Sequence, residues 1–363
     1  MSGDLPAIVL VPGFLGTNLA RPGGARLWLS IGQMLLGDLA TDMRFDGAGA
    51  PLLTDGLVEL VYSDLLDGLG AAGLVVYTFP FDFRRSVFAA AADLAAFIDA
   101  IARATGGKRF VLVAHSQGAL VTALYPYVDS AWATRVERSI LLGGPLCGTF
   151  DAVETAMGTH PLVERLGSHS LRDTTAEVGA CLRTWPGLFS MLPDPETFEG
   201  GEAAFDGGAW AHGFSPPQAM LDEAREVRRK IKGSPLFHER PCAHLLSLRY
   251  HTADAYVPGL VLAGPRSAPG DGTVPACTAS FQKIPAYHVD YPHQLLPLDP
   301  RAIRGIRDLA ATGTTDLERV SEAQCNARLL TTTEPAQLAL AASVLEGSST
   351  LAKVAWLLAP PGL

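Results

Sequence analysis

Ser116 lies in a setting suited to nucleophilic chemistry. Residues 114–118 read Ala-His-Ser-Gln-Gly and follow residues 110–113, a short apolar run rich in β-branched side chains. A serine hydroxyl attacks poorly near neutral pH unless a base takes its proton and an acid holds that base in the right tautomer. A sharp turn between a strand and a helix would raise the hydroxyl above a sheet edge. We therefore predict that Ser116 is a nucleophile; the alternative is an ordinary turn serine.

The residues around Ser116 agree with such a turn. Ala114 and Gly118 are small, and a larger side chain at either place would collide with neighbouring backbone. Glycine is usual at the first of these places, so Ala114 adds one methyl group. Apolar residues then recur at roughly helical spacing at Leu120, Val121 and beyond. The local prediction is a strand, a sharp turn and a helix.

The acid and the base of such a site follow the serine along the chain, in the order Ser, Asp or Glu, His. Asp271 lies between two glycines in a turn after a predicted strand, which is an unusual place for a merely solvated charge. We predict that Asp271 is the acid, and Asp254 and Asp290 are the alternatives.

Nine histidines are available for the base. His293 follows a proline on a loop that leads into a helix, and His288 is its rival; a surface histidine is the plain alternative for either. His115 is next to the nucleophile, but a tight turn would point it away, so we assign it to packing. We predict that His293 is the base.

A loop near the start of the chain could supply part of an oxyanion hole. Residues 7–11 are a buried-strand run, and Pro12, Gly13 and Phe14 follow at once. A tight glycine-bearing turn can present a backbone N–H to a developing negative oxygen. We predict the Phe14 N–H as that donor, against the alternative of a plain Pro-Gly turn. Asp82 precedes the serine, so we interpret it as a structural ion pair with Arg84 or Arg85.

The elements that must position these residues alternate between strand and helix. We predict strands at 7–11, 73–77, 110–113, 139–142, 245–250 and 260–262, and helices at 87–104 and 301–311, the first capped by Ser86. This order indicates an α/β fold with a mostly parallel central sheet and helices on both faces. Ligands of such sheets bind at the carboxyl ends of the strands, where the residue-12 loop and Ser116 both fall.

Two insertions interrupt the core, which we assign to residues 1–145 and 241–312. Residues 20–70, with a predicted helix at 27–39, form a small cap, and the aromatic-rich residues 146–240 form a lid. One lid helix has an apolar stripe and a basic face. The basic face is either an ordinary solvated surface or a patch that contacts an anionic lipid surface. The stripe is Leu221, Ala224, Val227 and Ile231, and the basic residues are Arg225, Arg228, Arg229, Lys230 and Lys232. We predict a helical extension over residues 313–363.

Composition narrows the function. The chain has 363 residues, 48% hydrophobic and 18% charged, which is typical of a folded protein. Its net charge of −9 argues against a nucleic-acid partner. The five cysteines are scattered without a C-x-x-C pair, so we expect neither a zinc site nor a disulfide framework. No apolar stretch is long enough for a transmembrane helix, and no export signal opens the chain; we expect a cytoplasmic protein, although a signal removed earlier would leave the same sequence.

Several motifs resemble the lecithin:cholesterol acyltransferase-like branch of the α/β-hydrolases, which includes phospholipid:diacylglycerol acyltransferases and lysosomal phospholipase A2. They are Pro-Gly-Phe at 12–14 with Gly-Thr-Asn-Leu at 16–19, Phe-Asp-Phe-Arg at 81–84, Ala-His-Ser-Gln-Gly at 114–118, Gly-Pro at 144–145, Met-Leu-Pro at 191–193 and Gly-Asp-Gly-Thr-Val-Pro at 270–275. The resemblance implies an α/β-hydrolase fold with an inserted lid. It also implies a triad of Ser116, Asp271 and His293, with Phe14 and Gln117 N–H groups as the oxyanion hole.

The leading hypothesis is thus a lipase or acyltransferase that forms an acyl-enzyme on Ser116. Its substrate would be an acyl ester, with water or an alcohol as acceptor, and it would need no cofactor or metal. Peripheral membrane contact is compatible with this hypothesis. A small-ester or amide hydrolase outside lipid metabolism is the alternative, and a non-catalytic scaffold on the same fold is a third reading.

Overall fold

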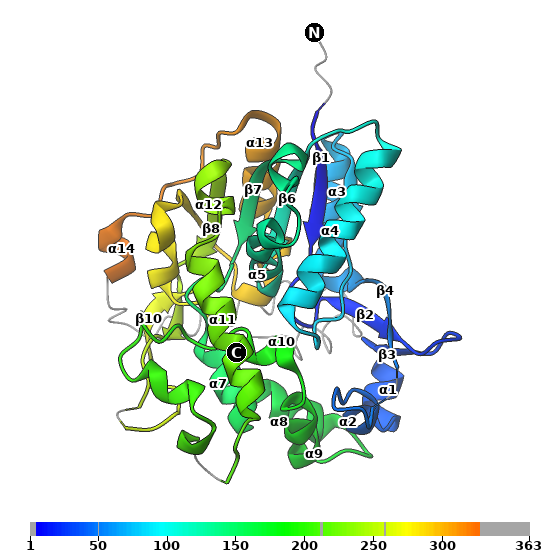
Figure 1. Cartoon of the computed structure of the whole chain (residues 1–363), viewed down its shortest axis with the longest axis vertical. Coiled ribbons are helices and arrows are strands. Elements are labelled where there is room, and N and C mark those ends of the chain that lie inside the picture. Colours follow the sequence, from blue (N-terminus) through cyan, green and yellow to red (C-terminus); the bar gives the residue numbers. More distant parts are fainter. Residues whose placement is uncertain (1–4, 50, 211–212, 258, 327–363) are drawn as a thin grey trace.

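A six-stranded parallel sheet forms the centre of the computed structural model, which describes residues 5–49, 51–210, 213–257 and 259–326 (Figure 1). The strand order is β11-β8-β7-β6-β1-β5. The strands are β1 Ala7–Val11, β5 Val76–Thr78, β6 Phe110–His115, β7 Val136–Leu142, β8 Cys242–Ser247 and β11 Ala286–Val289. The predicted α/β fold with a parallel sheet is confirmed.

Helices cover both faces of this sheet because the side chains of each buried strand alternate between them. Ile8 and Leu10 of β1 pack in one apolar cluster with α3 (Glu59–Ala71) and α13 (Pro300–Thr312). Val9 and Val11 pack in the other, which includes the second set of helices. That set is α4 Val87–Ala104, α5 Gln117–Leu124 and α11 Gln218–Lys232. A strand buried on both faces is apolar along its length, as β1 is and as β6 is up to Ala114.

Helix α4 begins and ends where the sequence predicts. The Ser86 side chain accepts a hydrogen bond from the Phe88 N–H at 3.2 Å, which satisfies one of the free N–H groups at the helix start. Leu94 and Ile98 are buried on its inner face. Helix α13 likewise confirms the helix predicted at 301–311.

The segment between β1 and β5 contains a small antiparallel sheet, β3-β2-β4, and two short helices. The elements are β2 Thr17–Ala20, β3 Arg26–Trp28, β4 Leu53–Leu57, α1 Ile31–Leu36 and α2 Leu39–Asp42. The single helix predicted at 27–39 is therefore wrong. Residues 26 and 28 pair with β2. The Ser30 side chain caps a helix that starts at Ile31, and Gly37 ends it.

The long segment between β7 and β8 is helical, and no strand occurs in its described residues, 143–210 and 213–241. Its helices besides α11 are α7 Phe150–Met157, α8 Pro161–His169, α9 Thr175–Leu182, α10 Pro186–Phe189 and α12 Leu236–Glu239, with 3-10 turns η2 Gly201–Phe205 and η3 Gly207–Ala209. Helices α7, α8 and α9 lie beyond the carboxyl ends of the sheet strands, at the lower end of Figure 1. This placement suits the lid predicted at 146–240, whose boundaries stay a prediction.

Helix α11 confirms the predicted apolar stripe but corrects the basic face. Arg228 is buried, and its guanidinium donates hydrogen bonds to three backbone carbonyls, those of Pro145, Leu146 and Ser190. The other four basic residues have partners near the surface: Arg225 pairs with Glu202, Arg229 with Glu226 and Lys232 with Asp194 and Glu196, while Lys230 lies over the Tyr127 ring. These partners offset much of the charge that an anionic lipid surface would need.

The segment after β8 carries the predicted acid and base. Strands β9 (Tyr250–Ala253) and β10 (Arg266–Gly270) form an antiparallel pair outside the main sheet. The strand predicted at 260–262 is wrong, because these residues form a bend between β9 and β10. The 3-10 helix η5 (His293–Leu298) precedes α13. The extension predicted at 313–363 includes the short helix α14 (Glu322–Asn326), and its residues from 327 onward lie outside the described part.

Candidate active site

Ser116 occupies a strained turn between β6 and α5. Its backbone has φ 52° and ψ −125°, a conformation that side-chain-bearing residues rarely adopt. Gly118 is needed two residues later, because a Cβ there would lie 2.4 Å from the Pro12 carbonyl oxygen. Ala114 is fully buried in β6, so the extra methyl group fits. The predicted sequence of strand, sharp turn and helix is confirmed.

The structure brings the three predicted side chains together. His293 Nε2 lies 2.7 Å from Ser116 Oγ, and His293 Nδ1 lies 2.7 Å from Asp271 Oδ2. The backbone N–H of His293 also donates to the backbone carbonyl of Asp271 at 2.9 Å. A hydroxyl, an imidazole and a carboxylate in this chain of contacts can move a proton from the serine to the histidine. The catalytic roles themselves stay predictions.

Two backbone N–H groups hold the Asp271 carboxylate in place. Thr273 and Val274 donate to Asp271 Oδ1 at 3.0 and 2.6 Å, which leaves Oδ2 for His293. Gly143 lies behind this pair with φ 58°, and a Cβ there would be 3.0 Å from His293 Nδ1. The turn sequence around Asp271 and the glycine at 143 therefore both serve the orientation of the imidazole.

The alternative residues are engaged elsewhere. His288 lies in β11 with Asp290 at 3.6 Å, and Asp290 also pairs with Arg249 and Arg301. Asp254 lines a separate pocket. Asp82 forms the predicted buried ion pair, and its partner is Arg84, which contacts both carboxylate oxygens.

The loop after β1 packs directly against the serine. A Cβ on Gly13 would lie 2.7 Å from Ser116 Cβ, so only glycine permits this approach. The Trp28 ring N–H donates to the Leu15 carbonyl at 2.8 Å, which fixes the loop from the other side. Phe14 lines the pocket with Ser116, and Gln117 is the first residue of α5, where an N–H has no acceptor within the helix. Phe14 thus lines the same pocket as Ser116, and Gln117 is the next residue in the chain; their roles as oxyanion donors stay predictions.

A hydrogen-bond relay that the sequence reasoning missed connects this loop to the base. The Gly13 N–H donates to Tyr62 Oη at 2.8 Å, and Tyr62 Oη lies 2.9 Å from His115 Nδ1. His115 Nε2 then lies 3.1 Å from the His293 carbonyl oxygen. The His293 carbonyl can only accept, so the neutral His115 ring carries its hydrogen on Nε2. Nδ1 then accepts from the Tyr62 hydroxyl, which itself accepts from Gly13. Burial, with a smaller effect of His293, lowers the pKa of His115 to about 3 and keeps it neutral.

The prediction that His115 serves only packing is therefore incomplete. The signal for Tyr62 in the sequence is one hydroxyl among the buried residues of α3, next to Val61 and Leu65. Such a hydroxyl usually has a buried partner. The identity of that partner depends on the fold, because Gly13, Tyr62 and His115 are far apart in the chain.

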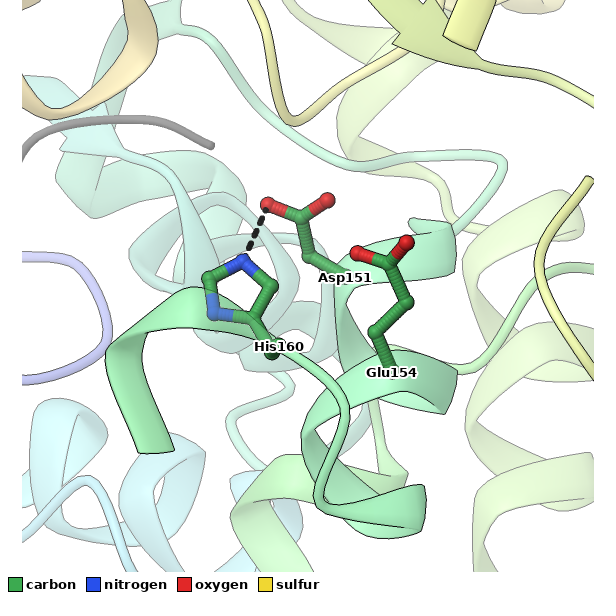
Figure 2. A group of neighbouring side chains, drawn as sticks. All are labelled: Asp151, Glu154 and His160. Atoms are coloured by element: carbon green, nitrogen blue, oxygen red, sulfur yellow. Dashed lines mark ion pairs between the residues drawn. The ribbon is translucent and has the colours of Figure 1, made fainter. Parts of the chain in front are cut away.

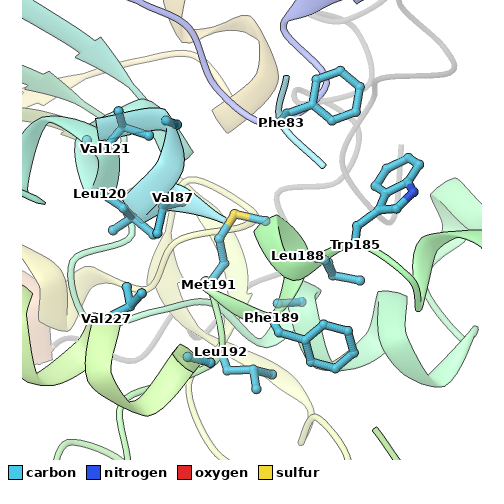
Figure 3. Packing of buried hydrophobic residues seen from close by; sticks show 14 of the residues in the cluster. Phe83, Val87, Leu120, Val121, Trp185, Leu188, Phe189, Met191, Leu192 and Val227 are labelled. Carbon is cyan, nitrogen blue, oxygen red and sulfur yellow. The ribbon is translucent and has the colours of Figure 1, made fainter. Parts of the chain in front are cut away.

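The Gln117 side chain fastens a pocket wall as well. Its Nε2 donates to the carbonyls of Phe83 and Gly187 at 3.3 and 2.8 Å, which ties α10 to the start of α5. Phe83 and Trp185 pack together with ring centres 5.6 Å apart, and both belong to the larger apolar cluster, part of which Figure 3 shows. Helix α10 therefore has a fixed position over Ser116.

The pocket at Ser116 is lined by apolar residues and by a group of polar residues, several of which are linked by hydrogen bonds; we call these two groups its apolar and polar sides. Its volume is about 100 Å³. The apolar side comprises Phe14, Leu15, Pro145, Ala152, Leu162, Leu188, Met191 and Val274; the polar side comprises Thr149, Asp151, Thr155, His160, Thr273 and Gln294. A second, wholly apolar cavity shares Leu15 with it and is lined by Trp28, Leu39, Ala40, Met43, Leu166, Val178, Cys181, Leu182 and Trp185.

The polar side includes a group with the side-chain types of a metal site, namely Asp151, Glu154 and His160 (Figure 2). Arg266 Nη2 donates to Asp151 Oδ1 at 2.7 Å and also contacts Glu154. Burial raises the pKa of Asp151, but Arg266 and His160 lower it more, so it lies well below its usual range. The guanidinium thus supplies the positive charge that these carboxylates need, and the group fits a divalent cation poorly.

The chain is similar to known proteins in part of its sequence and in its fold. The family model described as Lecithin:cholesterol acyltransferase matches residues 52–231. The structure described as the crystal structure of the Tle4-Tli4 complex is similar, with a TM-score of 0.57 and 12% identity over 86% of this chain and 100% of that chain. The mature form of Bacillus licheniformis lipase BlEst2 gives a TM-score of 0.45 and 12% identity over 85% and 94%. No curated protein sequence gives a significant match.

The family match confirms the resemblance to the lecithin:cholesterol acyltransferase-like branch of the α/β-hydrolases. It supports an enzyme that hydrolyses or transfers the acyl group of lipid esters. The structural similarity shows the fold. Within the described residues, no helix combines the length and the apolar character needed to span a bilayer.

Proposed function

We propose that the protein is a serine-dependent lipase or acyltransferase that cleaves a carboxylic ester of a lipid-like substrate through an acyl-enzyme on Ser116. The observation that carries the proposal is the chain of two 2.7 Å contacts from Ser116 Oγ through His293 to Asp271, at the wall of a pocket. The proposed reaction needs no metal or cofactor.

The first half of the reaction forms the acyl-enzyme. Ser116 Oγ attacks the ester carbonyl carbon while its proton passes to His293 Nε2. Asp271 keeps the imidazole oriented and stabilises its charged form. The carbonyl oxygen becomes negative and accepts hydrogen bonds from the Phe14 and Gln117 N–H groups. The intermediate then collapses, and the alcohol leaves with the proton that His293 held.

The second half repeats these steps with another nucleophile. Water gives up a proton to His293 and attacks the acyl carbon, which releases the carboxylic acid and restores Ser116. An alcohol that takes the place of water gives a new ester instead. The balance between these outcomes depends on how well residues 146–240 exclude water from the pocket.

The apolar side of the pocket supports a lipid-like acyl group. The second cavity begins at Leu15, beside the proposed oxyanion loop, and has an apolar lining. Ligand pockets usually measure about 300–1,000 Å³, so a long acyl chain needs a larger space than the 100 Å³ observed. We infer that the acyl chain extends past Leu15 into the second cavity after a small movement of α8 or α9. Leu166 of α8 and Val178 and Leu182 of α9 line that cavity.

A panel of esters with one alcohol and acyl chains of increasing length tests the proposal. We expect kcat/KM to rise with chain length and all activity to disappear in Ser116→Ala. An added alcohol acceptor shows whether transfer competes with hydrolysis. Activity that falls steeply with chain length would instead favour the small-ester or amide hydrolase, and activity that survives in Ser116→Ala would exclude the acyl-enzyme.

A further inference from the structure

Two buried polar atoms on the polar side of the pocket lack a hydrogen-bond partner among the described residues. They are His160 Nε2 and Gln294 Oε1, and both residues line the pocket together with Ser116. His160 is only 6% exposed. Buried polar groups are nearly always hydrogen-bonded, so unpartnered ones beside a nucleophile indicate contact with a ligand.

The network around Thr273 determines which atom of the Gln294 amide is available. Thr273 Oγ1 donates its single hydrogen to Asp151 Oδ2 at 2.8 Å. The same oxygen must therefore accept the 3.2 Å contact with Gln294, which requires the NH₂ group on that side. The Gln294 oxygen is left as a free acceptor.

The His160 ring offers the opposite character. The Leu162 N–H donates to His160 Nδ1 at 3.2 Å, so the neutral ring carries its hydrogen on Nε2. Nε2 lies 3.3 Å from Asp151 Oδ2 but is not aligned as a hydrogen bond (Figure 2). The polar side of the pocket therefore presents one donor and one acceptor, both fixed by neighbouring groups.

The charge of this side disfavours an anionic ligand. Arg266 is occupied by Asp151, Glu154 and the Gly272 carbonyl. Among the described residues that line the pocket, none is Lys or Arg. A phosphate group would thus meet the Asp151 carboxylate without a free cation to pair with.

The position of Gln294 relates this side to the alcohol half of an ester. His293 must protonate the departing alcohol, so that alcohol lies beside His293 Nε2, and Gln294 is the next residue in η5. The acyl half has the apolar side and the cavity beyond Leu15. A hydroxyl group both donates and accepts, which matches the two free atoms.

We propose that His160 and Gln294 form a subsite for the alcohol portion of the ester, and that this portion is a neutral polyhydroxy alcohol of the glycerol type. The inference rests on the proposed function, because it takes Ser116 as the nucleophile. It adds a substrate class: a neutral acyl ester whose alcohol has free hydroxyl groups.

Three esters with the same acyl chain test the subsite: a monoester of glycerol, the propyl ester and a monoester of glycerol phosphate. We expect kcat/KM for the glycerol ester to exceed that for the propyl ester about tenfold, which corresponds to about 1.4 kcal/mol. Gln294→Met should remove most of this preference and change the propyl ester by less than about twofold, since one hydrogen bond is lost. Gln33→Met on α1, outside the pocket lining, is the matched control and should keep the preference.

Reaction with a fluorophosphonate separates the two proposals. If Ser116 reacts and the wild-type enzyme does not distinguish glycerol from propyl esters, the subsite is wrong while the proposed function stands. The subsite is also wrong if a Gln294→Met variant that still reacts with the fluorophosphonate loses kcat/KM equally for the glycerol and propyl esters. A preference of the wild-type enzyme for the glycerol phosphate ester would overturn it as well. If Ser116 does not react and no ester is cleaved, the proposed function fails and the subsite with it.

Discussion

The residues assigned to chemistry and those assigned to substrate choice differ in how the chain builds them, and we call them the turn side and the helix side of the site. The residues assigned to chemistry, Ser116, Asp271 and His293, lie on short turns at or beside the carboxyl end of the sheet, and backbone hydrogen bonds hold them. Most of the other residues that line the pocket come from the helical segment between β7 and β8, where side-chain contacts decide the geometry. We infer that reactivity depends on the turns, and that selectivity can change in the helices without loss of reactivity.

Asp271→Asn is the strongest test of the turn side. An amide cannot hold the His293 tautomer, so we expect kcat to fall about 10⁴-fold with little change in stability. Ester hydrolysis at saturating substrate measures the effect, and thermal unfolding checks the fold. A loss below about tenfold would remove Asp271 from the catalytic group.

The stability of the folded protein should fall in acid because of two buried histidines near the turn side. Burial, with a smaller effect of His293, lowers the pKa of both His115 and His244 to about 3. Each ring accepts a hydrogen bond in its neutral form, His115 from Tyr62 and His244 from the Gly144 N–H. The unfolded chain binds these protons near pH 6.5 while the folded chain does not, so stability present above that pH is lost as the pH falls toward 3.

Urea unfolding at pH 7.5 and pH 5 measures this loss. We expect the two histidines to lower the unfolding free energy by about 4 kcal/mol between these pH values, about 2 kcal/mol each. His115→Gln should reduce the pH dependence. Equal stability of the wild-type protein at both pH values would contradict the assignment of neutral buried histidines.

Gly143→Ala tests how closely the turn side is packed. The added Cβ would lie 3.0 Å from His293 Nδ1, at a residue with φ 58°. We expect the imidazole to shift and kcat to fall about 100-fold, the usual result of a small misplacement in a catalytic group. Gly70→Ala in α3, where no atom lies within 4 Å, is the control and should leave kcat unchanged.

Tyr62→Phe removes the centre of the relay between Gly13 and His115. The Gly13 N–H and His115 Nδ1 would both lose a partner, so we expect kcat to fall about tenfold and KM to stay nearly constant. Tyr127→Phe, which removes an exposed hydroxyl that donates to the Lys230 carbonyl, serves as the control. An unchanged kcat in Tyr62→Phe would show that the relay is structural only.

Leu166→Phe on the helix side should have the smallest effect on activity. It should change only the selectivity for acyl-chain length. The larger ring would fill part of the cavity beyond Leu15, so we expect kcat/KM for long-chain esters to fall about fivefold, as one or two methylene groups lose their place. Short-chain esters should react as before. Equal loss on both would contradict the division between reactivity and selectivity.

The sequence could predict the turn side because the constraints there are local or ordered along the chain. The apolar run, the small residues around Ser116 and the glycines around Asp271 indicate their own backbone shapes, and the order of the three residues selects His293. Contacts elsewhere in the molecule could not be predicted from the sequence. The burial of Arg228, the pairing of Arg26–Trp28 with β2 and the contacts of Asp151 with Arg266 and Thr273 all depend on tertiary packing between distant segments.

Mass spectrometry of the protein after reaction with a fluorophosphonate tests the central claim most directly. We predict a single adduct on the peptide that contains Ser116, no adduct in folded Ser116→Ala, and labelling slowed by about 10³-fold or more in His293→Ala. An adduct on another residue, or ester hydrolysis that persists in Ser116→Ala, would contradict the account.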